Sequence, residues 1–513
     1  MGKIWLVSIN RFNFMNLVRS LIGNHLKKFF FLGFLLFLVF LLPKLINLRG
    51  GIILGEPDEF VHIKLVESIL RTGRPVFQGK GFYYEMPGYF ALAAVLTKIL
   101  NLTPIVSLRL ISFLSTLATS FLIFFYLQRK NDWVEGLLGG LLYFLIPLTV
   151  FYSRIGIIEP LLVFFLTGAV IFFDLGRVEK NWRFSVFSGV FLGLGFLTKY
   201  SVLPIFLLVA AFFLFDFIRD NFKFWESPSF KLRLSSFVPL ALALLLFTPV
   251  LFYFYRSDTL TLKDQTRQIF GLTGETKQEL RWERLGDFSW WFSPYLIFLA
   301  IVGFVVRLKN FRREGFLTLS FLLMVATVLS RLPFYTRYAL VSAPFWAIFA
   351  AGGAVFLARR KFWWVVLILV FFLNTNSVYQ AWIVSRSTFL DEAVKKALLI
   401  KPQAKWIFSN YWPNILASVG GIPNYAWLTY DGPDLRAFAP NETRDALTIL
   451  KEEGGVIILE DLYVMNFITV QPGRDRAIKE VEKNYVPNFT LENQNSNFPF
   501  LKIKSDNLKV YVF

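Results

Sequence analysis

The sequence has no cysteine, and only two of its 513 residues, His25 and His62, are histidine. The missing cysteine excludes a disulfide framework and a metal site built from thiolates. Charged residues are scarce too: they make up 17% of the chain, whereas soluble domains carry about a quarter. In contrast, 55% of the residues are hydrophobic and the mean hydropathy is +0.54. The composition therefore predicts a polytopic membrane protein.

The excess of positive charge is confined to one part of the chain. The net charge is +19, but residues 385–513 hold 15 basic and 15 acidic side chains, so the whole excess lies upstream. In a membrane protein such a bias is typical of cytoplasmic loops, and we do not expect nucleic-acid binding. The basic start of the chain precedes an apolar run that is too long for a signal peptide. It predicts an uncleaved first span and a cytoplasmic amino terminus.

A helix of about 20 apolar residues spans a bilayer. Eleven apolar runs predict spans at 29–48, 107–127, 134–152, 161–175, 184–197, 202–218, 237–255, 290–306, 316–329, 339–358 and 362–378. If these spans alternate in direction, all five basic clusters between them fall on the cytoplasmic side. A further apolar stretch at 87–102 would break this alternation if it crossed the membrane. We therefore interpret it as a juxtamembrane or re-entrant helix in the first outer loop.

This topology places the polar motifs on one outer face. They are EPDEFVH (56–62), YSRIGIIEP (152–160), TKYS (198–201), the loop 256–290 and RLPFYTRY (331–338). Ionisable residues at membrane depth are costly and usually face a cavity, so their gathering on one side favours a functional site. Structural explanations stay open for each: helix capping for Asp58 and Glu59, ion pairing for Arg154 and Glu159, snorkelling for Lys199, and an interface anchor for Arg337.

Carboxylates beside cations at a membrane surface suit one class of reaction. A carboxylate can take the proton of an acceptor hydroxyl. Cations such as Arg154, Lys199 and Arg337 can bind a phosphate and stabilise it as it leaves. The combination predicts transfer of a group from a lipid-borne phosphate.

Of the adjacent acids, Asp58 is expected to carry the chemistry. Their side chains diverge by about 100° at a helix start. Val61 and Leu65 follow on the face of Asp58, which predicts that this acid lies on the drier, packed side. Glu59 heads a more mixed face with His62, so we expect it to act mainly as a helix-start acid whose neutralisation costs little.

The motifs follow an order that resembles a known family. They are PDE after the first span, YYEMPGYFAL (83–92), RLISFLSTLATSFLIFFYLQRK (109–130), YSRIGIIEPLLVFF (152–165), GVFLGLGFLTKYSVLPI (189–205) and RYALVSAP (337–344). This order resembles the GT-C glycosyltransferases, in the branch that contains protein O-mannosyltransferases and the lipid A aminoarabinose transferase. The resemblance implies a polyprenyl- or dolichyl-phosphate sugar donor, a lipid, glycan or protein acceptor, and transfer on the extracytoplasmic face of the bilayer.

Carried over residue by residue, the resemblance implies roles for five side chains. Asp58 resembles the catalytic acid of the first loop and Glu159 the second acid. Lys199 and Arg337 resemble the cations that contact the donor phosphate. Glu85 matches an acid that helps some members to hold a divalent metal.

The chain also departs from the family pattern. Met86 stands where the family's branch often has lysine. The long loop 256–290 lacks the histidine that partners the metal. His62 is the candidate to replace that histidine as a metal ligand. The alternative is that His62 is a solvated histidine on a helix face. The WWDYG signature of oligosaccharyltransferases does not occur, which sets that relative aside.

The last part of the chain predicts a separate domain, so we expect a transmembrane domain at 1–384 and an extracytoplasmic α/β domain at 385–513. Residues 404–410, 454–461 and 507–513 read as strands, and 391–400, 444–453 and 473–484 as helices. A different function also stays open. A polytopic transporter or flippase of a lipid-linked sugar would also have many spans and buried charges, although no pairing of halves is visible. An inactive lipid-binding protein of the same fold is the third possibility.

Overall fold

The structure is a computed structural model that describes the chain in several ranges of residues. These are 58–77, 80–82, 85–221, 239–250, 252, 291–309, 311–330, 336–385, 390–409, 422, 424–431, 434–439, 442–445, 452–460, 481, 483, 485–492 and 507–512. The predicted first span and the loop 256–290 lie outside them.

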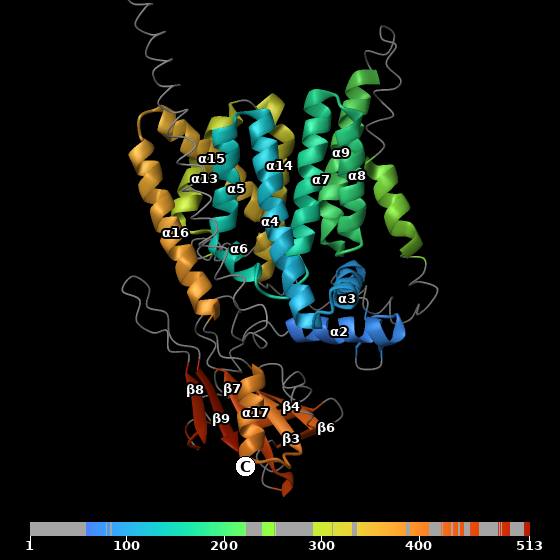
Figure 1. Ribbon diagram of the computed structural model, residues 1–513, viewed down its shortest axis with the longest axis vertical. Coiled ribbons are helices and arrows are strands. Elements are labelled where there is room, and N and C mark those ends of the chain that lie inside the picture. Colours follow the sequence, from blue (N-terminus) through green and yellow to red (C-terminus); the bar gives the residue numbers. More distant parts are fainter. Residues whose placement is uncertain are drawn as a thin grey trace, which may run out of the picture. The chain divides into compact units, whose positions relative to one another are not determined.

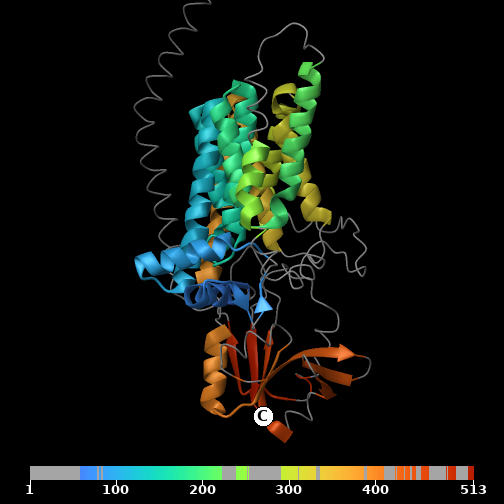
Figure 2. The same cartoon turned by 90° about the vertical axis from the view of Figure 1, so that its right-hand side faces the viewer.

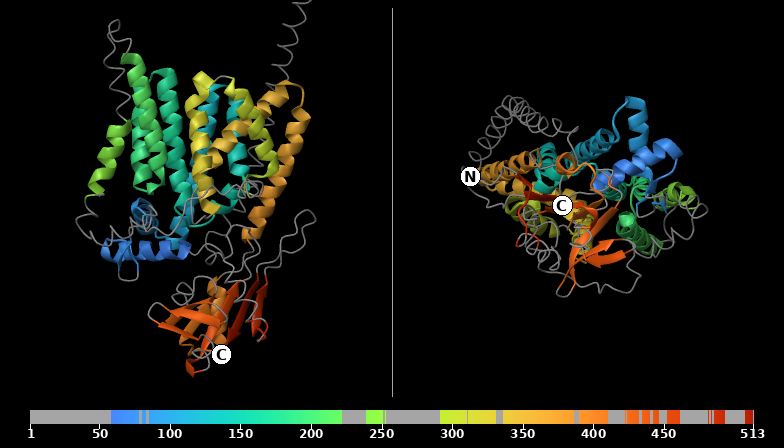
Figure 3. Two further views of the ribbon diagram at one scale, coloured as in Figure 1. Left: turned by 180° about the vertical axis from the view of Figure 1, so that it is seen from behind. Right: turned by 90° about the horizontal axis from the view of Figure 1, so that it is seen from below.

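Most of the described chain folds as a helical bundle (Figure 1). Its helices are α4 (Pro104–Lys130), α5 (Trp133–Leu145), α6 (Pro147–Tyr152), α7 (Glu159–Glu179), α8 (Trp182–Phe196), α9 (Leu203–Asn221), α13 (Pro294–Leu308), α14 (Phe311–Ser330), α15 (Ala343–Arg359) and α16 (Trp363–Ser385). Helices α7, α8 and α9 form one side of the bundle, and α13, α15 and α16 form the other (Figures 1 and 3).

The helices match the apolar runs of the sequence, with one correction. Among the described residues, three helices are long and apolar enough to cross a membrane: Pro104–Lys130, Glu159–Glu179 and Arg337–Arg359. The other apolar helices are shorter, so the number of spans stays a prediction. The run predicted as one span at 134–152 is not one continuous helix, because α5 ends before Ile146, which is extended, and α6 follows it. Pro147 causes the break, since a residue before proline avoids the helical conformation.

Two further helices lie crosswise to the bundle, at the end where α4 and α7 begin (Figures 1 and 2). They are α2 (Asp58–Thr72) and α3 (Gly88–Leu100), and a short hairpin of β1 (Val76–Phe77) and β2 (Lys80–Gly81) lies between them in the sequence. Helix α3 has 13 residues, a length of about 20 Å, which is less than the roughly 30 Å of the hydrocarbon core. Its crosswise direction, unlike that of the equally short bundle helix α5, supports the juxtamembrane interpretation of residues 87–102.

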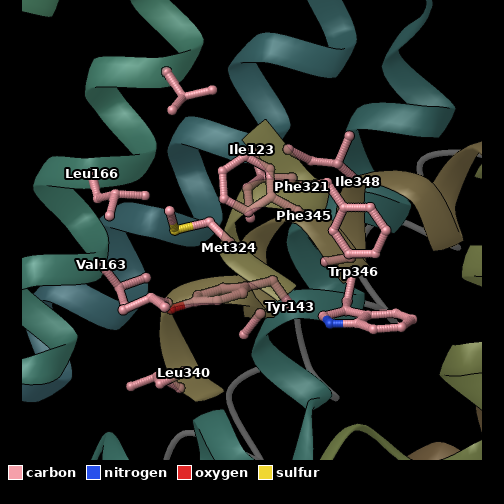
Figure 4. Packing of buried hydrophobic residues seen from close by; sticks show 14 of the residues in the cluster. Ile123, Tyr143, Val163, Leu166, Phe321, Met324, Leu340, Phe345, Trp346 and Ile348 are labelled. Atoms are coloured by element: carbon pink, nitrogen blue, oxygen red, sulfur yellow. The ribbon is translucent and has the colours of Figure 1, made fainter. Parts of the chain in front are cut away.

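The bundle core is aromatic and closely packed. Figure 4 shows Tyr143 of α5 facing Val163 of α7, with Met324 of α14 and Trp346 of α15 nearby. In lipid the hydrophobic effect does not drive helices together, so close packing and small residues have to do so. Gly303 illustrates this, because a methyl group there would collide with the backbone of α15.

A network of buried charges ties the bundle helices together at the far end of α7. We call it the second network, and its members are Lys130, Glu135, Asp174, Arg307 and Glu314. The Lys130 Nζ donates to Asp174 Oδ2 at 2.7 Å and pairs with Glu314 Oε2 at 3.0 Å. Arg307 pairs with Glu314 at 3.0 Å and also with Glu135. No member has a side chain more than 8% exposed.

The last part of the chain forms a seven-stranded sheet in the order β6-β5-β4-β3-β7-β9-β8. The strands are β3 (Trp406–Ser409), β4 (Asn424–Asp431), β5 (Asp434–Ala439), β6 (Glu442–Asp445), β7 (Gly455–Glu460), β8 (Phe489–Glu492) and β9 (Asn507–Val512). Strand β3 runs parallel to β4 and β7, and all other pairs are antiparallel. Helix α17 (Leu390–Ile400) packs Ala393 and Val394 in one apolar cluster with residues of β3, β7 and β9.

Some of the strands and helices predicted for this part of the chain are confirmed, and one is wrong in part. Strands β3, β7 and β9 and helix α17 occur where the sequence predicts them. The helix predicted at 444–453 is wrong at its start, because residues 442–445 form β6 and pair with β5. Residues 446–451 lie outside the described residues, as does nearly all of 473–484. The domain boundary at 384–385 stays a prediction.

Candidate active site

The site begins at the first turn of α2, where the two adjacent acids point to different partners. Glu59 accepts two hydrogen bonds from Arg109 of α4, at 2.7 and 2.8 Å, and both side chains are buried. It also accepts one from the backbone N–H of Gly156 at 2.7 Å. Asp58 instead pairs with Arg337.

These contacts correct the expectation for the two acids. Glu59 is fully buried, whereas the side chain of Asp58 is 23% exposed. The prediction that Asp58 lies on the drier side is therefore wrong, as is the reading of Glu59 as a simple helix-start acid. Helical periodicity places the two side chains apart but does not say which neighbouring element covers each face. Here Arg109 and the loop before α7 cover Glu59.

His62 is the second point at which α2 meets that loop. Its Nδ1 donates to the backbone oxygen of Gly156 at 2.9 Å, and its Nε2 lies 3.0 Å from Glu85 Oε2. The side chain is 3% exposed, so the reading of a solvated histidine is wrong. The peptide of Gly156 thus holds two residues of α2 at once. A side chain at position 156 would press on Leu108 and Glu59.

The turn before α3 places Glu85 against Lys199. The N–H of Gly88 donates to the carbonyl oxygen of Leu197 at 2.9 Å, and a methyl group at position 88 would collide with that oxygen. The start of α3 therefore lies directly against the turn that follows α8. Two residues beyond Leu197, the Nζ of Lys199 donates to Glu85 Oε1 at 2.8 Å.

Lys199 connects this corner to the start of α7. Its Nζ also donates to Glu159 Oε1 at 2.8 Å, and the same oxygen lies 3.4 Å from Nε of Arg337. Arg337, in the short helix η3 (Thr336–Ser342), then reaches Asp58. As the first residue of α7, Glu159 also benefits from the helix dipole, which favours an acid at this end.

These contacts form one chain of alternating charges, which we call the site network. In order its members are His62, Glu85, Lys199, Glu159, Arg337 and Asp58. They come from five segments that are far apart in the sequence. Asp58 ends the chain and is its most exposed member at 23%, while the other five side chains are at most 11% exposed. The network therefore has one open end.

The charges of the network shift the proton affinities of its members. Burial alone would raise the pKa of Glu85, but the charge of Lys199 and the hydrogen bond from His62 hold it far below its usual value. Burial would likewise lower the pKa of Lys199, yet Glu159 and Glu85 raise it. Glu85 is thus a carboxylate and Lys199 an ammonium ion at neutral pH.

Two further positions noted in the sequence are Arg154 and Met86. Arg154 is buried in the loop before α7, where burial and the charge of Arg109 lower its pKa to about 10. Glu159 pairs with Lys199 and Arg337, and a role of Arg154 in donor binding stays a prediction. Met86 packs in an apolar cluster with Tyr200 and Phe247.

Glu85 and His62 do not fit a divalent metal site. Each oxygen of Glu85 already faces a nitrogen donor, Lys199 Nζ at 2.8 Å or His62 Nε2 at 3.0 Å. A dication there would lie against the ammonium group of Lys199. In the part of the chain that the structure describes, no three His, Asp or Glu side chains cluster as a metal ion requires.

The sequence did not single out Arg109 or Gly156 as parts of the site. For Arg109 a signal was present, because an arginine inside an apolar span has to find a partner. Gly156 carried no comparable signal. Its importance comes from the contacts of its peptide group, which any residue type possesses.

Comparisons with known proteins find one family model and several solved structures of similar fold. Residues 85–253 match the family model of dolichyl-phosphate-mannose-protein mannosyltransferase. ArnT from Cupriavidus metallidurans in the apo state is similar over 95% of this chain and 98% of its own, with 12% identity and a TM-score of 0.57. No curated protein matches significantly.

Two further solved structures carry lipid phosphates. The same ArnT bound to undecaprenyl phosphate is 12% identical over 93% of this chain and 97% of its own, with a TM-score of 0.55. The archaeal oligosaccharyltransferase AglB from Archaeoglobus fulgidus, in complex with an inhibitory peptide and a dolichol-phosphate, is 13% identical over 77% of this chain and 64% of its own, with a TM-score of 0.51. The resemblance drawn from the motifs is thereby confirmed, and this chain has the fold of the GT-C membrane glycosyltransferases.

Proposed function

We propose that this protein transfers a sugar from a polyprenyl-phosphate donor to an acceptor hydroxyl or amide. The observation that carries the proposal is the site network, in which five buried groups hold an accessible carboxylate, Asp58, beside a cation, Arg337. A transfer from a lipid phosphate needs this pair: a base for the acceptor and a cation for the leaving phosphate. The undecaprenyl phosphate of ArnT and the dolichol-phosphate of AglB support the class of donor.

The proposed reaction is a direct displacement. The acceptor atom attacks the anomeric carbon of the sugar while its proton passes to Asp58. The bond between that carbon and the phosphate oxygen breaks, and the prenyl phosphate leaves with the electron pair. Arg337 and Lys199 stabilise the charge that develops on the phosphate. Glu159 contacts both cations and is 1% exposed, so we assign it to positioning them.

The location of the site follows from the topology. We propose that the amino terminus is cytoplasmic and that the site network and the last domain are extracytoplasmic. Because the chain has no cysteine, single cysteines can test this at two exposed residues, Arg74 and Lys180. Arg74→Cys should react with an impermeant thiol reagent on intact cells, and Lys180→Cys only after permeabilisation. The opposite pattern would overturn the topology.

The function itself can be tested with purified protein in liposomes. Prenyl-phosphate sugars of different sugar types are supplied with candidate acceptors, and release of prenyl phosphate is measured by mass spectrometry. We expect release with the lipid donor and no turnover of nucleotide sugars. Movement of the intact lipid-linked sugar between leaflets, with no cleavage of its phosphate bond, would establish a flippase instead. Mass spectrometry of surface glycans and lipids from a deletion strain would name the sugar and its acceptor.

A further inference from the structure

Both ring nitrogens of His62 face groups that only accept hydrogen bonds. Nδ1 lies 2.9 Å from the backbone oxygen of Gly156, and Nε2 lies 3.0 Å from Glu85 Oε2. A carbonyl oxygen has no proton to give, and an ionised carboxylate has none either. A neutral imidazole carries a single N–H, so it satisfies only one of the two contacts. Both contacts are made when the ring carries a proton on each nitrogen.

We propose that His62 is a positively charged histidine that takes the place of a metal ion beside Glu85, so that sugar transfer by this protein needs a protonated His62 and no divalent cation. The inference rests on the proposed function. It makes His62 a positioning residue, because it acts through Glu85 and Lys199 and does not reach the reacting atoms itself.

The surroundings of His62 favour its charged form. Helix α3 contributes the rings of Tyr89 and Phe90, whose centroids lie 5.7 and 5.1 Å from that of the imidazole ring. The turn before α3 contributes Glu85, and the loop before α7 contributes the carbonyl of Gly156. On α2 itself, the negative charge of Asp58 acts on the ring. Burial alone would lower the pKa of His62, but Glu85 and Asp58 outweigh it and raise the pKa.

The charges of the six network members can be counted as well, with the neighbouring pair Arg109–Glu59 and the buried cation Arg154 of the loop before α7 left out of the count. The network contains three carboxylates, Asp58, Glu85 and Glu159, but only two permanent cations, Lys199 and Arg337. With neutral His62 the network would carry a net charge of −1, in a largely buried place that has to receive an anionic phosphate. Unbalanced buried charge is costly and would repel the donor. A proton on His62 brings the network to neutrality.

The protonation state can be observed without any assay of activity. The chain has only two histidines, so His25→Gln leaves His62 as its single histidine. In this variant, labelled with ¹⁵N-histidine and reconstituted in lipid, solid-state NMR should show both ring nitrogens protonated at pH 7. Glu85→Gln in the same background should give the neutral ring. A neutral ring at pH 7 with Glu85 intact would overturn the proposal.

The role in transfer is tested by metal removal and by the pH profile. Wild-type protein freed of metal with EDTA should transfer at an unchanged rate, and added Mn²⁺ or Zn²⁺ should not change the NMR signals of His62. The rate should fall as the pH rises through the raised pKa of His62. His62→Gln should be about 10²-fold slower, because Glu85 and Lys199 lose their alignment, and should lack this fall.

The outcomes separate the two proposals. A wild-type protein that cleaves no prenyl-phosphate sugar would refute the proposed function. The NMR experiment would still decide whether His62 is protonated. An active protein that loses its activity in EDTA, and regains it with metal, would refute only the role of His62. His62→Gln that keeps the wild-type fall in rate would refute it as well.

Discussion

Helix α7 connects two buried charge networks of similar composition and different character. Glu159, its first residue, belongs to the site network, and Asp174 belongs to the second network, about 22 Å further along the helix. The second network is closed, with every side chain at most 8% exposed. The site network ends in Asp58, which is 23% exposed.

The origin of the members differs as well. All five members of the second network lie within bundle helices: Asp174 is inside α7, and the other four are in the first or last turn of α4, α5, α13 or α14. The site network uses first residues of helices, Asp58 and Glu159, and turn residues, Glu85 and Lys199. A buried charge network alone is therefore no sign of a site. The comparison indicates that an accessible member and an origin in turns mark the functional one, and substitutions can test this distinction.

The largest effect is expected at the open end of the site network. Asp58→Asn keeps the size of the side chain and removes the base, so transfer should slow by about 10²–10⁴-fold. Thermal stability should change little, because Asp58 is partly exposed. The assay is release of prenyl phosphate by protein in liposomes. The matched control is Glu67→Gln on the same helix, where the acid pairs with Lys64 at the surface. An active Asp58→Asn protein would remove the distinction between the two networks.

The second network should show the reverse pattern. Lys130→Met removes the cation that pairs with Asp174 and Glu314, and breaking a buried pair costs about 3–5 kcal/mol of stability. The folded protein should keep its specific activity at low temperature. Differential scanning fluorimetry and the transfer assay measure the two effects.

Arg359→Met is the control for this prediction. Arg359 also pairs with an acid, Asp132, but its side chain is 71% exposed, so the loss should stay below about 1 kcal/mol. Equal melting temperatures for the two variants would show that the second network does not hold the bundle together.

A substitution beside Glu85, in the first turn of α3, should have smaller effects on both stability and transfer. Gly88→Ala forces α3 away from Leu197, and such overpacking costs about 1–3 kcal/mol. The shift also separates Glu85 from Lys199, so transfer should fall by about 10²-fold. Ala91→Ser, on the exposed side of α3, should change neither quantity. If Gly88→Ala loses stability but no activity, the position of Glu85 does not matter for transfer.

The smallest effect concerns stability as a function of pH. The pKa of Glu85 is lowered from 4.5, so its contribution is complete above 4.5 and is lost as the pH falls toward the lowered value. The pKa of His62 is raised from 6.5, so its contribution is complete below 6.5 and is lost as the pH rises through the raised value.

The melting temperature should therefore be highest between pH 4.5 and 6.5 and decline at higher pH. Each unit of pKa shift corresponds to about 1.4 kcal/mol. His62→Gln should lose the decline above pH 6.5, whereas His25→Gln should retain it. A decline of the same size in His62→Gln would assign it to other groups.

Much of the site was predictable, because topology alone brings distant loops to one face. Asp58, Glu159, Lys199 and Arg337 occupy motifs that the sequence predicts in outer loops, and the structure joins them in one network. Their chemical roles stay predictions. The fold was predictable for a related reason, since an apolar run of 20 residues leaves few alternatives to a helix.

The contacts of α2 were not predictable in the same way. Periodicity orders Asp58, Glu59 and His62 around the helix axis, but it is silent on which element covers each face. The strands β4, β5 and β6 were missed for a comparable reason. Their sequences lack a regular apolar alternation, and they are held by pairing with each other and with β3.

The double hold on Gly156 has a consequence for anyone who redesigns this protein. Its N–H donates to Glu59 and its carbonyl oxygen accepts from His62. The loop before α7 and helix α2 therefore depend on each other for their positions. Chimeras that exchange only one of them with a related protein should lose the contacts between Gly156 and helix α2. Chimeras that exchange both should keep a working centre, which makes this pair the smallest unit to transplant.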